Sequence, residues 1–134
     1  MAKEQIVSQR LARPSGQFSQ ATAIEARGRL VFISGMVARG ADGALVGKGD
    51  IEAQTRQVCE NLKAAVEAAG GAMADICRVD VFIRNMEHFE IIHRVRREYF
   101  EEPLPASTMV EVVKMTSPDF LIEISAIAVI PETR

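Results

Sequence analysis

Glu123 is a candidate for chemistry because it is the single charged residue in the apolar segment 120–130. A carboxylate held among apolar side chains can accept a proton from water and so act as a general base. Such carboxylates cluster at functional sites, although some are only structural and are held by hydrogen bonds to neighbours. We interpret Glu123 as a candidate catalytic residue that activates water, with the structural role as its alternative.

Other residue types that commonly carry chemistry are not arranged for it. His88 and His93 are about 140° apart around a helix, so they do not form the i, i+4 pair of a helical metal site. Ser107 and Ser125 have no adjacent histidine to serve as a base. The glycine-rich segment 40–49 lacks the lysine–serine ending of a phosphate-binding loop. The sequence therefore predicts neither a metal site nor a phosphate loop.

Size and charge limit the classes of function. A length of 134 residues predicts one domain, residues 1–134, and the formal net charge of −2 argues against a nucleic-acid partner. Cys59 and Cys77 fit neither a redox motif nor a secreted disulfide framework. The N-terminus lacks the apolar core of a signal peptide, and no apolar run is long enough to span a membrane. We expect a cytoplasmic protein with no membrane partner.

The hydrophobic pattern predicts an α+β fold in which strands dominate both ends of the chain. Segment 30–36 is apolar at successive positions, which predicts a central strand covered on both faces. Asp50 is a helix N-cap, and Gly70 follows the end of the same helix. The predicted strands are 5–7, 19–26, 30–36, 76–84, 105–112 and 120–130, and the predicted helices are 51–69 and 85–100.

Two helices can cover only one face of such a sheet. The other face is expected to carry large apolar side chains: Phe82, Met109, and either Leu121 and Ile127 or the residues that alternate with them. An apolar sheet face of that size is unusual for a monomer. We therefore expect the uncovered face to pack against further copies of the chain.

Several segments, in order and spacing, resemble the Rid family of reactive intermediate deaminases, also called the YjgF or L-PSP family. They are Phe32 to Gly35, Gln54 to Gln57 with Asn61 and Leu62, Val79 to Ile83, Pro105 with Ala106, and Ile122 to Val129. The resemblance implies a chorismate-mutase-like fold, with two helices on one face of a mixed sheet of five to six strands. It also implies a homotrimer with a small-molecule cleft between subunits. The implied chemistry is hydrolysis of imines or enamines, such as 2-aminoacrylate, to keto acids and ammonia without any cofactor.

The resemblance assigns site residues position by position. Glu123 matches the water-activating glutamate, and Ser34 and Gly35 match residues that line the ligand cleft. Three further cleft positions differ from the family: Phe18 replaces a tyrosine, Ser107 replaces the arginine that grips the substrate carboxylate, and Met109 replaces a cysteine.

Loss of that arginine makes the substrate uncertain. The arginine would make two charge-assisted hydrogen bonds to the substrate carboxylate, each worth about 1.5–3 kcal/mol. Their loss weakens substrate binding by roughly two to four orders of magnitude. Arg84 and Lys114 are candidate replacements, whereas Arg96 is expected to serve packing. The leading hypothesis is a hydrolase with a changed substrate, and the alternative is a non-catalytic trimer that binds a metabolite or partner. A ribonuclease or translation inhibitor is disfavoured by the acidic charge balance.

Overall fold

The computed structural model describes residues 3–25 and 27–132, and its elements follow the predicted order. Those residues form the strands β1 (Lys3–Ile6), β2 (Ala21–Ile24), β3 (Arg29–Met36), β4 (Ile76–Ile83), β5 (Ala106–Glu111) and β6 (Ile122–Ile130). The helices are α1 (Ile51–Ala68) and α2 (Phe89–Tyr99), with short 3-10 helices η1 (Met73–Asp75) and η2 (Met86–His88). The predicted α+β class is confirmed.

Capping residues determine where the helices begin and end. The Asp50 carboxylate accepts a hydrogen bond from a backbone N–H in the first turn of α1. Gly70, just beyond the helix, has φ 97°, a conformation that favours glycine. The second helix was predicted from Asn85, but this side chain caps η2 through the Glu87 N–H. The α-helix itself therefore begins one turn later than predicted.

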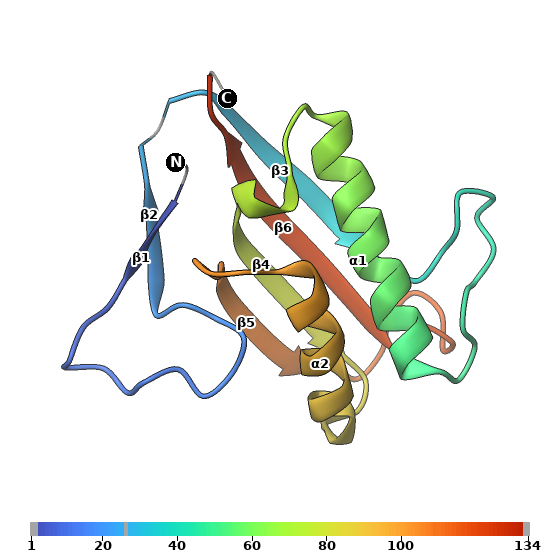
Figure 1. Ribbon diagram of the computed structural model, residues 1–134. Coiled ribbons are helices and arrows are strands. Elements are labelled where there is room, and N and C mark those ends of the chain that lie inside the picture. The colour runs from blue at the N-terminus through green and yellow to red at the C-terminus, as the bar shows by residue number, and fades with distance from the viewer. Residues whose placement is uncertain (1–2, 26, 133–134) are drawn as a thin grey trace.

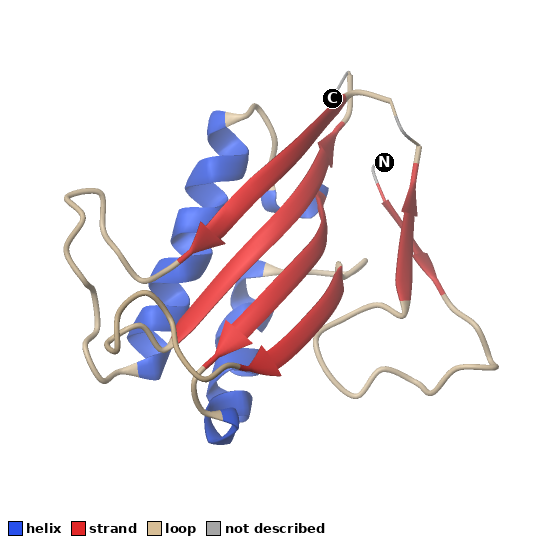
Figure 2. Cartoon of the chain, turned by 180° about the vertical axis from the view of Figure 1, so that it is seen from behind, coloured by secondary structure: helices blue, strands red, loops and turns tan. Residues whose placement is uncertain are grey.

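The main sheet has the strand order β3-β6-β4-β5, in which β4 and β5 are parallel and the other pairs antiparallel. Alternate residues of the two central strands, among them Val79, Val81, Ile122 and Ile124, are fully buried. Both α-helices lie against this face (Figure 1). Within the described residues, no helix lies over the opposite face of the sheet (Figure 2). The hydrophobic core therefore lies on one side of the sheet.

Strands β1 and β2 form a separate antiparallel hairpin and do not extend the main sheet (Figure 1). Two hydrogen bonds attach this part of the chain to the sheet. The Ser19 N–H donates to the Pro105 carbonyl at 3.1 Å, and the Thr22 hydroxyl donates to the Cys77 carbonyl at 2.9 Å. The six described strands are thus divided between a four-stranded mixed sheet and a hairpin beside it.

Two predictions about the sheet faces are wrong for the described chain. Segment 30–36 was expected to be covered on both sides, but β3 lies at an edge of the sheet and Phe32 is 72% exposed. Met109 was expected on the open face, but the parallel register pairs it with Val81, and it packs against the core. Phe82 follows Val81 in β4 and lies on the open face, as predicted. The alternation of residues along a strand shows which side chains share a face of the sheet. Only the register with the neighbouring strand shows which of the two faces packs against the helices.

Both cysteines are free thiols, and the environment of Cys59 keeps it neutral. Cys59 is fully buried in α1, and this burial raises the pKa of its thiol to about 12. Within the described ranges, no helix has the length and apolar character needed to cross a membrane.

Candidate functional site

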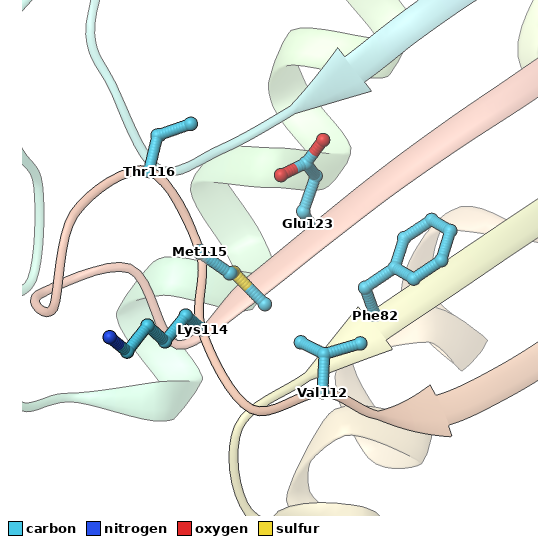
Figure 3. Close-up of a pocket in the computed structure, with 6 residues that line it drawn as sticks. All are labelled: Phe82, Val112, Lys114, Met115, Thr116 and Glu123. Atoms are coloured by element: carbon cyan, nitrogen blue, oxygen red, sulfur yellow. The ribbon is translucent and has the colours of Figure 1, made fainter.

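Glu123 is on the open face of the sheet and lines a pocket (Figure 3). On β6 it pairs with Phe82 of β4, and both residues alternate with fully buried neighbours. The pocket has a volume of about 390 Å³, and the segment after β5 forms its other side. Its lining residues are Phe82, Val112, Lys114, Met115, Thr116 and Glu123. A partly buried carboxylate thus faces a space large enough for a small molecule and water.

Gly35 lies directly against the Glu123 side chain. It occupies the irregular part of β3, between Ile33 and Met36, where the register with β6 shifts. A Cβ atom on Gly35 would overlap Glu123 Oε2 and would come within 2.8 Å of its Cδ. Ser34, which precedes Gly35 in the chain, is exposed. Three of the predicted site residues therefore lie together on the open face, and the glycine leaves room for the carboxylate.

Ser107 is on the opposite face of the sheet. The parallel register pairs it with Val79, which is buried beneath the helices. Its hydroxyl accepts a hydrogen bond from Arg96 Nη2 of α2 at 3.2 Å, and the same nitrogen donates to the Gln17 carbonyl at 3.2 Å. Phe18 follows Gln17 in the chain and is half-buried. A second group of predicted cleft residues therefore gathers around the Arg96 guanidinium.

Sequence reasoning underestimated Arg96 and misplaced His93. Arg96 was assigned to packing, yet it is a buried cation, 2% exposed, in contact with Ser107. His93 was expected to be a surface or cap residue, but it is buried and stacks on Phe89, with ring centroids 4.0 Å apart. Burial and the neighbouring Arg96 charge lower the pKa of His93. The available signal was their spacing, since His93 and Arg96 follow Phe89 and Ile92 on the same helical stripe.

The other proposed cations do not lie at Ser107. Lys114 lines the Glu123 pocket on the open face, and Arg84 donates from Nε to the Val112 carbonyl at 3.2 Å. In the described part of the chain, no cluster of three histidine, cysteine or carboxylate side chains is arranged to hold a metal ion.

Comparison with known proteins identifies the family. The family model described as Endoribonuclease L-PSP matches residues 8–130. The chain belongs to this family, the Rid family. A RutC family protein of Pyrococcus horikoshii is 43% identical over 126 residues, 94% of this chain and 97% of that one. A 2-iminobutanoate/2-iminopropanoate deaminase of Dermatophagoides farinae is 35% identical over 131 residues, 97% of this chain and 99% of that one.

A solved structure supports the same assignment. A Rid-family protein of Yersinia pestis superimposes with a TM-score of 0.88 at 32% identity, over 97% of this chain and all of that one. The predicted family and fold are thereby confirmed. The positions of Ser107, Phe18 and Met109 within a cleft remain predictions.

Proposed function

We propose that this Rid-family chain is an imine hydrolase, which converts a small imine or enamine and water into a carbonyl compound and ammonia. The observation that carries the proposal is the partly buried Glu123 carboxylate at a pocket of about 390 Å³, with Gly35 leaving room beside it. The Dermatophagoides farinae relative, a deaminase by name, supports the reaction class. The charge of −2 continues to disfavour a nucleic-acid substrate.

The chemistry assigned to Glu123 is proton transfer. Its carboxylate accepts a proton from water while the water oxygen bonds to the imine carbon and the carbon–nitrogen π electrons move to nitrogen. The same carboxyl returns that proton to nitrogen, which gives a carbinolamine. It then accepts the carbinolamine hydroxyl proton and passes it to nitrogen, so that the carbon–nitrogen bond breaks, the carbonyl forms and ammonia leaves. A positioned general base contributes roughly 10²- to 10⁴-fold to such a reaction.

We further propose that the functional unit is a homotrimer with its cleft between subunits. The candidate residues of one chain lie on opposite faces of the sheet: Glu123 on the open face and Ser107 under α2. The open face also exposes Phe32 by 72% and Leu30 by 58%. Packing this apolar face against a second copy would bury it, and would allow the two groups of residues to meet from different chains.

Light scattering tests the assembly. The expected mass of the wild-type protein is three times the 14.7 kDa chain mass, and Phe32→Asp should shift the protein toward the monomer. Val7→Asp is the matched control, because Val7 is equally exposed at 72% but lies outside the main sheet. A monomeric wild type at micromolar concentration would exclude the trimer.

The reaction is tested by release of ammonia and carbonyl product, above the spontaneous rate, from imines generated in the assay by an amino-acid oxidase or, for the neutral imines, by an amine oxidase. The panel includes neutral imines, since Ser107 stands where the family resemblance implies a carboxylate-binding arginine. Glu123→Gln should lower the rate by roughly 10²- to 10⁴-fold. Glu101→Gln, an exposed carboxylate in a loop, should leave it unchanged. A wild type that accelerates no imine but binds the products would favour the non-catalytic alternative.

A further inference from the structure

The pocket beside Glu123 has an apolar wall made by three half-buried side chains. They are Phe82 of β4, Val112 just after β5, and Met115 in the segment that follows. Figure 3 shows the Met115 side chain extending from that segment toward Val112 and Phe82. Lys114, which also lines the pocket, is exposed and extends away from Glu123 in the same view. The wall therefore suits an uncharged, apolar part of a ligand.

Hydrogen bonds fix two parts of this wall. Phe82 lies within β4 and is paired with Glu123 of β6. The Val112 N–H donates to the Ile83 carbonyl at 2.8 Å, and the Val112 carbonyl accepts from Arg84 Nε at 3.2 Å. Phe82 and Val112 are thus held at set positions near the carboxylate. Neither residue can move far to fit ligands of different size.

Met115 is the adjustable part of the wall. It belongs to the segment 113–116, which has no regular secondary structure. Beyond this segment the chain is held again, because the Asp119 carbonyl and the Leu121 N–H each bond to the buried Gln54 side chain at 2.9 Å. A methionine side chain is unbranched and has three rotatable bonds, so it fills spaces of irregular shape. The position of Met115 therefore determines how much of the pocket a ligand can occupy.

Two other roles for Met115 account for less of the arrangement. The hydrophobic core lies on the opposite side of the sheet, under the helices, so a side chain in the Glu123 pocket does not fill it. The second role is contact with another copy in the proposed trimer. Such a contact would change the mass of the assembly and would leave the choice of ligand unaffected, so experiment can separate it from a role in specificity.

We propose that Met115 sets the size of the apolar substituent that the pocket accepts on the imine carbon. The inference rests on the proposed imine hydrolase and names its specificity-determining side chain. The imine carbon must lie close to Glu123 for water to be activated, so a substituent on that carbon can extend along the wall. Each methylene buried there should strengthen binding about fourfold, until the substituent meets Met115. A pocket of about 390 Å³ is near the lower end of the range for small-molecule sites, which favours a short substituent.

The experiment measures binding of straight-chain 2-alkanones, from propanone to 2-octanone, by NMR titration of the whole protein. These ketones are stable and uncharged, and they need no turnover. In the wild type, affinity should rise with chain length and then level off, and the longer ketones should shift the Met115 methyl resonance. Met115→Ala removes three heavy atoms from the wall, so it should strengthen 2-octanone binding relative to propanone by roughly 15- to 60-fold, the value of about two to three methylenes.

Two control variants separate size from other effects. Met115→Leu keeps an apolar side chain of similar volume and should retain the wild-type pattern. Val113→Ala shortens a side chain of the same segment that is 84% exposed, and it should leave the whole ketone series unchanged. Light scattering on each variant reports the mass of the assembly. Imines of matching chain length, generated from n-alkylamines by an amine oxidase, add a kinetic test, in which Met115→Ala should move the highest kcat/KM to longer chains.

The proposal is overturned if no ketone shifts the Met115 methyl resonance, a wild-type measurement that needs no folded variant. An equal change in the affinity for every ketone in Met115→Ala would also overturn it. So would a changed mass with an unchanged ketone series, which would assign Met115 to assembly. Ketone binding that depends on Met115, without hydrolysis of any imine, would support the inference and refute the hydrolase. Imine hydrolysis with a chain-length preference that Met115→Ala does not alter would do the reverse.

Discussion

Gly35→Ala should disable the proposed reaction while leaving the fold intact. The added methyl carbon would overlap Glu123 Oε2 and would lie 2.8 Å from Cδ and 3.0 Å from Cγ. All three atoms belong to one flexible side chain, so Glu123 can rotate away. Gly35 does not have a positive φ, so alanine fits the existing backbone. We expect the change in the free energy of unfolding to stay within about 1 kcal/mol, the cost of a displaced rotamer.

The effect on catalysis should be far larger than the effect on stability. Rotation of Glu123 removes a positioned general base, which is worth roughly 10²- to 10⁴-fold, or about 3–5 kcal/mol in the activation barrier. We expect Gly35→Ala to lower the hydrolysis rate by about 10²-fold or more in the imine assay. Urea unfolding, measured on the same preparation, should show a near-normal midpoint.

Two variants make this prediction refutable. Gly40→Ala adds the same methyl group in a loop, where the nearest atom would be Asp42 Oδ1 at 3.3 Å, and it should retain full activity. The combination Gly35→Ala/Glu123→Gln should be no slower than Glu123→Gln alone, because both changes remove one function. Full activity of Gly35→Ala, or an additive loss in the combination, would show that the observed carboxylate position is not the reactive one.

Two further predictions concern stability. Gln54 is fully buried, donates to the Gly47 and Asp119 carbonyls, and accepts from the Leu121 N–H. Gln54→Leu leaves these backbone groups unsatisfied and should cost about 3 kcal/mol in urea unfolding, and a loss below 1 kcal/mol would contradict this role. Burial and the Arg96 charge lower the pKa of His93 in the folded protein. As pH falls below about 6.5, His93 is therefore protonated in the unfolded chain before it is protonated in the folded one. The free energy of unfolding should therefore decline from about pH 6.5 downward until His93 is also protonated in the folded state. His93→Gln should reduce this dependence of stability on pH. An unchanged dependence would show that other groups cause it.

The sequence predicts most of the fold because its local signals agree. Asp50 and Gly70 mark the ends of α1, and the apolar runs with partial alternation in 76–84 and 120–130 identify the two central strands. Asn85, where the second helix was predicted to begin, instead caps a 3-10 turn ahead of α2. Local patterns thus define elements well and their first turns less well.

The candidate site could be predicted only in part. Glu123 was identifiable as a carboxylate in an apolar strand, and Gly35 was recognised only by resemblance. Which face of the sheet Met109 lies on depends on the register between β4 and β5. This register is a long-range property, so the alternation of residues along β5 does not determine it. The contact between Arg96 and Ser107 depends on how α2 packs over β5, so spacing along the chain could not reveal it.

The position of Glu123 and Ser107 on opposite faces of one sheet has a genetic consequence. In the proposed assembly, each cleft takes its water-activating half, with Glu123, from one chain and the half around Ser107 from another. A chain that lacks the Glu123 carboxylate and a chain whose cleft is blocked by a bulky residue at Ser107 would each be impaired alone. Mixed in equal amounts, they would rebuild about one quarter of the clefts from two sound halves. Defects on opposite faces would therefore complement each other, whereas two defects on the same face would not.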